Sequence, residues 1–292
     1  MKILSPDQIK KIAERYNRSH LSASALNLFA SSVPLYFVQY HMGVYGPANL
    51  AMIAGNVSER AVEYGIKNPE ASMEKCRDVA VKGWQEETRQ NPFNDKKKNL
   101  GTQEKQQAKL DDVIGYGSVR KSYPGMVASA ITELRKYGMP DDAQVKIETY
   151  LDGIPIPIIG FKDFTYDDHG IDIDLKTTGR MPVDMSADHQ LQGAIYRKAS
   201  GNRAQRFCYA TKSEAKVLEL EADAANRAIG RATMIAHTLF RLLSISEDIE
   251  EIYGLMIPDY SNFRWSEPTR AKAEQVWSAT SQINENEVTV VA

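Results

Sequence analysis

The sequence predicts an α/β protein with a small central mixed β-sheet flanked by helices and a mainly helical N-terminal section. Three observations support this: capped helical segments fill the first part, short alternating strands follow, and a long amphipathic helix comes after them. We expect a single domain over 1–292. Within it we expect a mainly helical part (1–140), a sheet core (141–222), a C-terminal helical part (223–283) and a flexible tail (284–292).

In the N-terminal part, start and stop signals place the helices. Pro6 after Ser5 suits the first position of a helix, and Ser22 can cap a second helix that ends before Pro34. Further helices are expected over residues 48–64, 71–89, 103–113 and 126–137. The segment 91–103, which contains three consecutive lysines, is expected to be a loop.

The centre of the chain alternates apolar and polar residues, a pattern typical of β-strands. VKIETYL, which begins at Val145, is the first strand, and the run ending in GFKDF is the second. The turn DDHG joins that run to IDIDLKT, which begins at Ile171, so the two form a hairpin. A helix capped by Ser186 follows, then the strands RFCYA and KVLEL, and then a long amphipathic helix over 223–243.

Composition excludes several classes of protein. With 36 Lys and Arg against 38 Asp and Glu, the net charge is −2, so any surface that binds nucleic acid must be local. No apolar run approaches the ~20 residues needed to span a bilayer, and the N-terminus does not resemble a signal peptide, so a cytoplasmic protein is expected. HExxH, GxSxG and phosphate-binding glycine motifs are missing from the sequence.

Acidic and basic residues gather on the predicted hairpin. Asp172, Asp174 and Lys176 share one face of their strand, and Asp163 lies on the partner strand opposite them. Carboxylates of this kind bind Mg²⁺ together with a substrate phosphate, and a neighbouring lysine can position the attacking water or offset phosphate charge. A half-exposed hairpin shows the same alternation, so a plain surface strand is the alternative. For Asp172 we expect a surface charge at the strand end.

Two helices carry polar residues at one-turn spacing. Gln192 and Tyr196 lie on one face of the helix that follows the hairpin. Upstream, Gly55 and Glu59 lie one turn apart on the helix expected over 48–64. A glycine inside a helix costs ~1 kcal/mol relative to alanine, so Gly55 indicates close approach of another backbone or of a substrate. Tight helix packing explains it equally well.

Together these motifs resemble the PD-(D/E)XK nuclease superfamily, in particular its RecB-like branch. LSASALNLFASSVPLYFVQYHMG resembles the Ser-rich opening helix of that branch, and GNVSE resembles its Gly-x-x-x-His segment with Glu59 in place of the histidine. GFKD matches the Gly-x-x-Asp motif, DLK matches the D-x-K core, and QGAIY is similar to the Gln-x-x-x-Tyr motif. The motifs follow the family's order over most of the chain, and they imply a restriction-endonuclease-like core.

The resemblance implies a role for each matched residue. Asp163 and Asp174 would ligate the metal, with the Leu175 carbonyl as a candidate third oxygen, and Lys176 would be the catalytic lysine. Glu59 would add a hard oxygen ligand, which favours Mg²⁺ or Mn²⁺, and one or two such ions are expected. The alternative role for Glu59 is a surface salt bridge.

The same resemblance marks residues for DNA binding. Gln192 and Tyr196 would contact the DNA backbone or orient the active site, with ordinary helix packing as the alternative. Ser22 and Ser24 of the opening helix are further candidates. Arg197 belongs to a basic group that could follow a DNA backbone, although basic residues at a helix end also complement the helix dipole.

These expectations combine into a stand-alone, metal-dependent DNA exonuclease. It would act on the ends of linear duplex or single-stranded DNA in phage-type recombination, in the host cytoplasm, and a single-strand annealing protein is a candidate partner. No iron–sulfur cluster is expected, because Cys76 and Cys208 cannot supply four thiolates and Val33 stands where cluster-binding relatives place a cysteine. The alternatives are a non-catalytic RecB-like DNA-binding or scaffold module and a structure-specific endonuclease.

Overall fold

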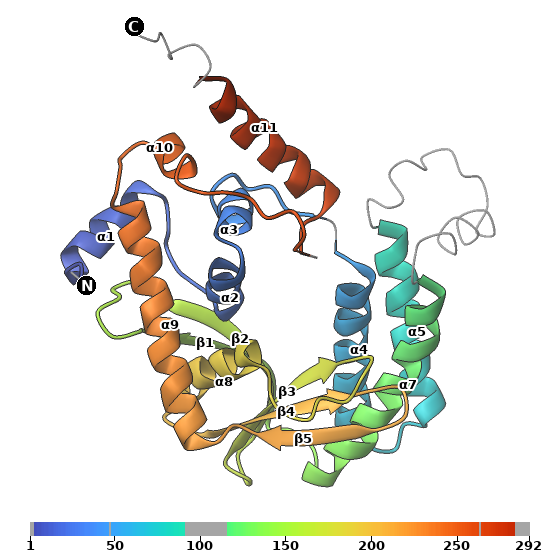
Figure 1. Ribbon diagram of the computed structural model, residues 1–292. Helices are drawn as coiled ribbons and strands as arrows, with labels where there is room; N and C mark the ends of the chain where they lie inside the picture. The colour runs from blue at the N-terminus through green and yellow to red at the C-terminus, as the bar shows by residue number, and fades with distance from the viewer. Residues whose placement is uncertain (1–2, 47, 91–115, 263, 284–292) are drawn as a thin grey trace, which may run out of the picture.

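A computed structural model of the chain describes residues 3–46, 48–90, 116–262 and 264–283 (Figure 1). The helices are α1 (Pro6–Arg15), α2 (Ala23–Ser31), α3 (Val33–Tyr40), α4 (Leu50–Lys67), α5 (Met73–Gln90), α7 (Tyr116–Leu134), the 3₁₀ turn η2 (Arg135–Tyr137), α8 (Ala187–Ala199), α9 (Ala222–Leu243), α10 (Ile249–Tyr253) and α11 (Glu267–Ile283). The strands are β1 (Asp142–Thr149), β2 (Ile158–Tyr166), β3 (Ile171–Thr177), β4 (Ala204–Ala210) and β5 (Ala215–Glu219).

The strands form one mixed sheet in the order β1-β2-β3-β4-β5. Neighbouring strands are antiparallel except for β3 and β4, which are parallel. Parallel neighbours need a long crossover, and α8 provides it between β3 and β4. The predicted fold class, a mixed sheet flanked by helices after a helical N-terminal part, is therefore confirmed.

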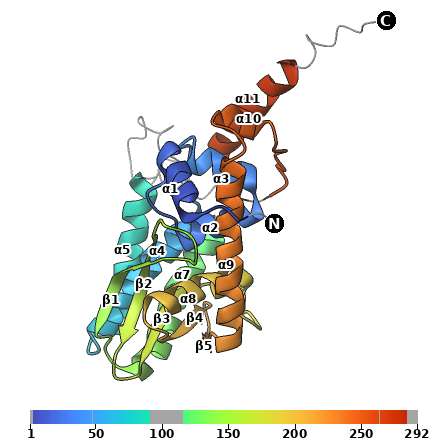
Figure 2. The same cartoon turned by 90° about the vertical axis from the view of Figure 1, so that its left-hand side faces the viewer.

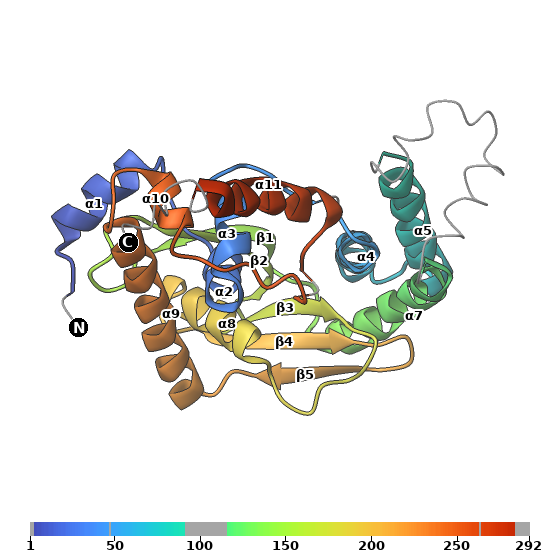
Figure 3. The same cartoon turned by 45° about the horizontal axis from the view of Figure 1, so that its top comes forward.

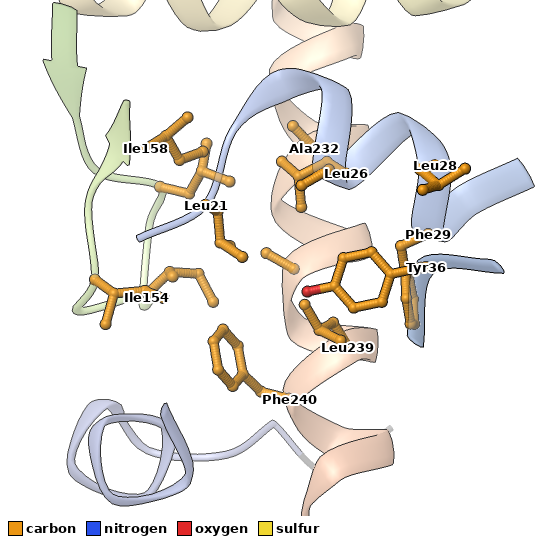
Figure 4. Packing of buried hydrophobic residues seen from close by; sticks show 14 of the residues in the cluster. Leu21, Leu26, Leu28, Phe29, Tyr36, Ile154, Ile158, Ala232, Leu239 and Phe240 are labelled. Carbon is orange, nitrogen blue, oxygen red and sulfur yellow. The ribbon is translucent and has the colours of Figure 1, made fainter. Parts of the chain in front are cut away.

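Helices cover both faces of the sheet, as Figure 1 and the tilted view of Figure 3 show. On one face α4 and α7 pack against the strands, in a cluster that includes Phe164 and Ile173, and α5 packs on the outside of these two helices. On the other face the apolar cluster includes Ile158 of β2 together with Leu26 of α2 and Ala232 of α9 (Figure 4). In Figure 2, α4 and α5 lie on one side of the sheet and α9 on the other. The central strand β3 is thus buried from both sides.

Several local predictions are confirmed by the caps and the turn. Ser5 and Gln8 form a capping box at α1, and the side chain of Ser22 accepts a hydrogen bond from the first turn of α2. Ser186 caps α8 in the same way. The hairpin turn between β2 and β3 ends at Gly170, whose φ of 63° lies in the left-handed region that glycine adopts readily.

Helix α7 differs from its prediction. The sequence pattern places its start at residue 126, after Pro124 and Gly125, but the helix begins at Tyr116 and continues through both. A Cβ atom at Gly125 would lie 2.4 Å from the carbonyl oxygen of Lys212 in the β4–β5 turn, so the helix packs directly against that turn. Tertiary packing therefore holds a helix across residues that locally disfavour one.

Other segments are new or lie outside the described residues. Helix α3 begins immediately after α2 and accommodates Pro34 in its first turn, where no N–H is needed, and the sequence does not predict it. Helices α10 and α11 lie in the part expected to be helical, 223–283, although no individual helix is predicted there after residue 243. The predicted loop over 91–103, helix over 103–113 and tail over 284–292 fall outside the described residues. Among the helices that the structure describes, none has the length and apolar character needed to cross a bilayer.

Candidate active site

Asp163 and Asp174 meet where strands β2 and β3 separate. The ladder between these strands ends at the pair Phe164–Ile173, and one further step in the same register places Asp163 opposite Asp174. At this step a side chain replaces the backbone ladder, because the N–H of Leu175 donates to Oδ2 of Asp163 over 2.8 Å. The end of the hairpin therefore brings the two carboxylates together.

Lys176 and Gln192 both contact Asp174. The ammonium of Lys176 forms an ion pair with Oδ2, and the amide of Gln192 donates to Oδ1 over 2.8 Å. Asp174 is only 6% exposed, and Gln192 of α8 lies against it. Within the described chain, Oδ2 of Asp174 accepts no aligned hydrogen bond, so the ion pair with Lys176 leaves this buried oxygen with spare capacity to bind a cation.

Tyr196 connects the helix α8 to strand β2. It lies one turn after Gln192 and is 7% exposed, and its ring covers Gly160, where a Cβ atom would lie 2.7 Å from Cε1. The motifs GFKD and QGAIY are thus in direct contact, which explains why the first position of GFKD is a glycine. The packing that the sequence left as an alternative for Tyr196 is present, and its contact with DNA stays a prediction.

Glu59 reaches the same region from α4. The amide of Gln144 on β1 donates to Oε1 of Glu59 and, over 3.4 Å, to Oδ1 of Asp163. The salt bridge considered as an alternative for Glu59 is not found among the described residues. Sequence reasoning missed Gln144, because no motif in the surrounding sequence marks it as a site residue. Its φ of 55° lies in the left-handed region, which glutamine does not favour, so its backbone conformation was not predictable either.

Gly55 faces the end of β3 one turn before Glu59. A Cβ atom at Gly55 would meet only Oγ1 of Thr177, at 3.8 Å, which is an ordinary van der Waals contact. The packing of the described residues therefore does not require glycine at this position. The tight helix packing that we considered as one explanation for Gly55 is wrong.

Ser22, Ser24 and Arg197 form no hydrogen bond or ion pair with the carboxylate cluster among the described residues. Ser22 accepts the N–H of Ala25 over 3.1 Å as the cap of α2, and its hydroxyl lies 3.0 Å from that of Ser24. Arg197 lines a separate hollow between α8 and α9, together with Asn226. The structure thus shows a capping role for Ser22, and DNA binding by these three residues stays a prediction.

The carboxylates interact strongly. Burial raises the pKa of Asp163 well above its ordinary value, and the charges of Asp174 and Glu59 raise it further. Burial and the charge of Asp174 also raise the pKa of Glu59. Burial alone would lower the pKa of Lys176, but the carboxylates of Asp174 and Asp163 outweigh it and raise that pKa, so the side chain is an ammonium. A cation at this place would relieve the repulsion between the acids.

Asp172 contradicts its sequence prediction as a surface charge. It is 2% exposed and accepts hydrogen bonds from Lys162 at 3.0 Å, from Thr165 at 3.0 Å and from Gln205 at 2.7 Å. The prediction fails because it treats β3 as half-exposed, whereas polar side chains of the neighbouring strands β2 and β4 surround this carboxylate. A buried charge needs such partners, and this network supports the hairpin next to the carboxylate pair.

The residues present fit a hard divalent cation in part. Across the described residues no group of three His, Cys, Asp or Glu side chains is arranged to hold a metal ion. Mg²⁺ needs only one or two carboxylates, with water and substrate phosphate completing its shell. Asp163 and Asp174 meet that smaller requirement, because Oδ2 of Asp174 accepts no aligned hydrogen bond beyond its ion pair with Lys176 and could also contact a cation.

The fold is a mixed sheet consistent with a restriction-endonuclease-like core, and the site holds two acids and a lysine at the open end of the central hairpin. This combination defines the class of protein to which the chain belongs. The sequence model of the PD-(D/E)XK nuclease superfamily matches residues 20–278, and the chain belongs to that superfamily. Members typically use divalent metal ions and act on nucleic acids.

No curated protein matches the chain in sequence. A solved structure described as "Crystal structure of SSO0001" is similar to 49% of this chain and 74% of its own, at 17% identity and a TM-score of 0.30.

Proposed function

We propose that the protein is a Mg²⁺- or Mn²⁺-dependent deoxyribonuclease that hydrolyses phosphodiester bonds at DNA ends. The observation that carries this proposal is the grouping of Asp163, Asp174 and Lys176 at the end of the β2–β3 hairpin, with Gln192 bound to Asp174. The exonuclease assignment, the RecB-like branch and a role in phage-type recombination rest on the order of the sequence motifs.

Each residue has a part in this chemistry. Asp163 and Asp174, with Glu59, would hold the ion, which when bound supplies an activated water and neutralises charge on the phosphate. The Lys176 ammonium is held beside Asp174 by their ion pair, where it would stabilise the charge that develops on the phosphate. Gln192 orients Asp174 through its hydrogen bond.

The substrate would approach between the hairpin and α4. Gly55 supports this approach, because the space next to it is open: among the described residues, a Cβ atom there would have only one ordinary contact. Ser22, Ser24 and Arg197 are proposed contacts for more distant phosphates, as are Gln192 and Tyr196 where they border the site. With a net charge of −2, these local contacts would supply the attraction to DNA.

The test uses an end-labelled linear duplex and a covalently closed circle, each incubated with Mg²⁺, Mn²⁺ or EDTA. The variant Lys176→Ala should abolish degradation with the metal present. The matched control is Lys216→Ala, which removes an exposed lysine from the edge strand β5. We expect this control to retain full activity.

The outcomes separate the functions considered. Metal-dependent loss of the linear DNA alone, absent in Lys176→Ala, supports the exonuclease. Cutting of the circle would show that the protein is an endonuclease and not an exonuclease. Binding of both substrates without degradation would overturn the catalytic assignment in favour of a scaffold module.

A further inference from the structure

Strand β1 is irregular at the point where it passes the carboxylate cluster. The β1–β2 ladder pairs Ala143 with Phe164 and Val145 with Lys162, but it skips the intervening pair of Gln144 and Asp163. Gln144 has a φ of 55°, a conformation that costs energy for a side chain of this type. The two irregular residues therefore lie directly opposite each other.

This irregularity changes which face of the sheet the side chains occupy. In a regular strand, residues an even number apart share one face. Ala143 packs in the apolar cluster of α4, α5 and α7, but Ile147 packs in the cluster on the opposite side. The same change occurs on β2 between Ile158 and Phe164. Because of the backbone distortion at Gln144 and Asp163, the side chains of these two residues do not follow the regular alternation between the two faces of the sheet.

The side chain of Gln144 lies between two acids. Its amide group donates to Glu59 and to Asp163, which come from different elements and repel each other. A neutral amide can bridge two carboxylates only through its N–H₂ group. The amide oxygen is on the same carbon, and half a turn about the last, soft torsion would point it where the N–H₂ group now lies. Glutamine carbonyls are suitable ligands for hard divalent cations.

We propose that Gln144 is a ligand of the divalent metal ion, in addition to the acids that the superfamily motifs mark. Without metal its amide N–H₂ group bridges Glu59 and Asp163, and with metal its amide oxygen faces the ion. This inference rests on the proposed function, because it takes the carboxylate cluster to be the metal site. It also accounts for the strained conformation, which places the amide between the two acids.

Direct titration of the full-length protein with MnCl₂ by isothermal calorimetry tests the proposal without measuring DNA cleavage. Gln144→Leu should weaken Mn²⁺ binding by on the order of tenfold, the size seen when a residue that supports a metal site is removed. Gln144→Glu should tighten it, because an added carboxylate raises the charge of the ligand set. Gln144→Asn tolerates the left-handed backbone but is one methylene too short, so it should resemble Gln144→Leu.

The controls keep failure of this inference distinct from failure of the proposed function. If wild-type protein binds Mn²⁺ and Asp163→Asn abolishes binding, the carboxylate site stands. Unchanged affinity in both Gln144→Leu and Gln144→Glu, with normal thermal unfolding, would then overturn the role of Gln144 alone. Tighter binding by Gln144→Leu would overturn it as well, since the amide would then compete with the ion. Absence of Mn²⁺ binding by wild-type protein would overturn both proposals.

Discussion

Gly160 offers the sharpest test of how the helix α8 is held against the sheet. A Cβ atom at this position would lie 2.7 Å from Cε1, 2.9 Å from Oη and 3.1 Å from Cζ of Tyr196. Unstrained carbon contacts begin at about 3.5 Å, so the ring or the strand would have to move by about 0.8 Å. Tyr196 is buried, and forcing an extra carbon into such packing costs about 1–3 kcal/mol. We expect Gly160→Ala to lower the free energy of unfolding by that amount.

Urea denaturation measures this loss, and nuclease activity should fall with it, because Tyr196 and Gln192 share α8 and Gln192 orients Asp174. Gly230→Ala is the matched control: it lies in α9 with open space around the added carbon, so it should stabilise the protein by up to about 1 kcal/mol. In a Tyr196→Ala background, Gly160→Ala should cost almost nothing. A loss below about 0.5 kcal/mol, or an equal loss with and without the tyrosine, would refute this account of the packing.

Two further predictions follow from the buried charges. Lys162→Met should lower the free energy of unfolding by about 1–3 kcal/mol in urea denaturation, because it leaves the buried Asp172 with the Arg203 guanidinium, at 3.4 Å, as its remaining charged partner, whereas exposed Lys216→Met should change it by less than about 0.5 kcal/mol. An equal effect of both variants would contradict the role of the network. The metal-free protein should lose stability as the pH rises above the ordinary pKa values of Asp163 and Glu59, 3.8 and 4.5, because both pKa values are raised in the folded state and folding therefore takes up protons. Thermal unfolding measured against pH should show a smaller loss of stability for Asp163→Asn than for wild-type protein, and saturating Mn²⁺ should reduce the loss of stability in wild-type protein. If the stability of both proteins falls equally steeply with pH in the absence of metal, the raised pKa of Asp163 is contradicted.

Features that depend on neighbouring residues could be predicted from the sequence. Ser22 and Ser186 cap helices because a hydroxyl reaches an N–H three residues away, whatever the rest of the chain does. The alternation of β3 and the turn before it predicted the hairpin, and with it the approach of Asp163 to Asp174. The order of the motifs predicted the superfamily, which the match over residues 20–278 confirms.

Other features depend on contacts between segments that are distant in the sequence. The burial of Asp172 requires Lys162 and Thr165 of β2 and Gln205 of β4 to surround it, and a strand's own alternation does not tell whether its polar face meets water or other parts of the chain. The same holds for α7, which continues through Pro124 because it packs on the β4–β5 turn.

Gln144 shows the clearest limit of sequence reasoning. Its left-handed backbone and its contacts with Glu59 and Asp163 arise only when β1, β2 and α4 come together. The sequence alone thus determined the helix caps, the β2–β3 hairpin and the family, and it marked Asp163, Asp174 and Lys176 as residues that lie together. The tertiary structure decided which of their neighbours are buried and what else enters the site, because burial and long-range pairing are properties of the packed chain.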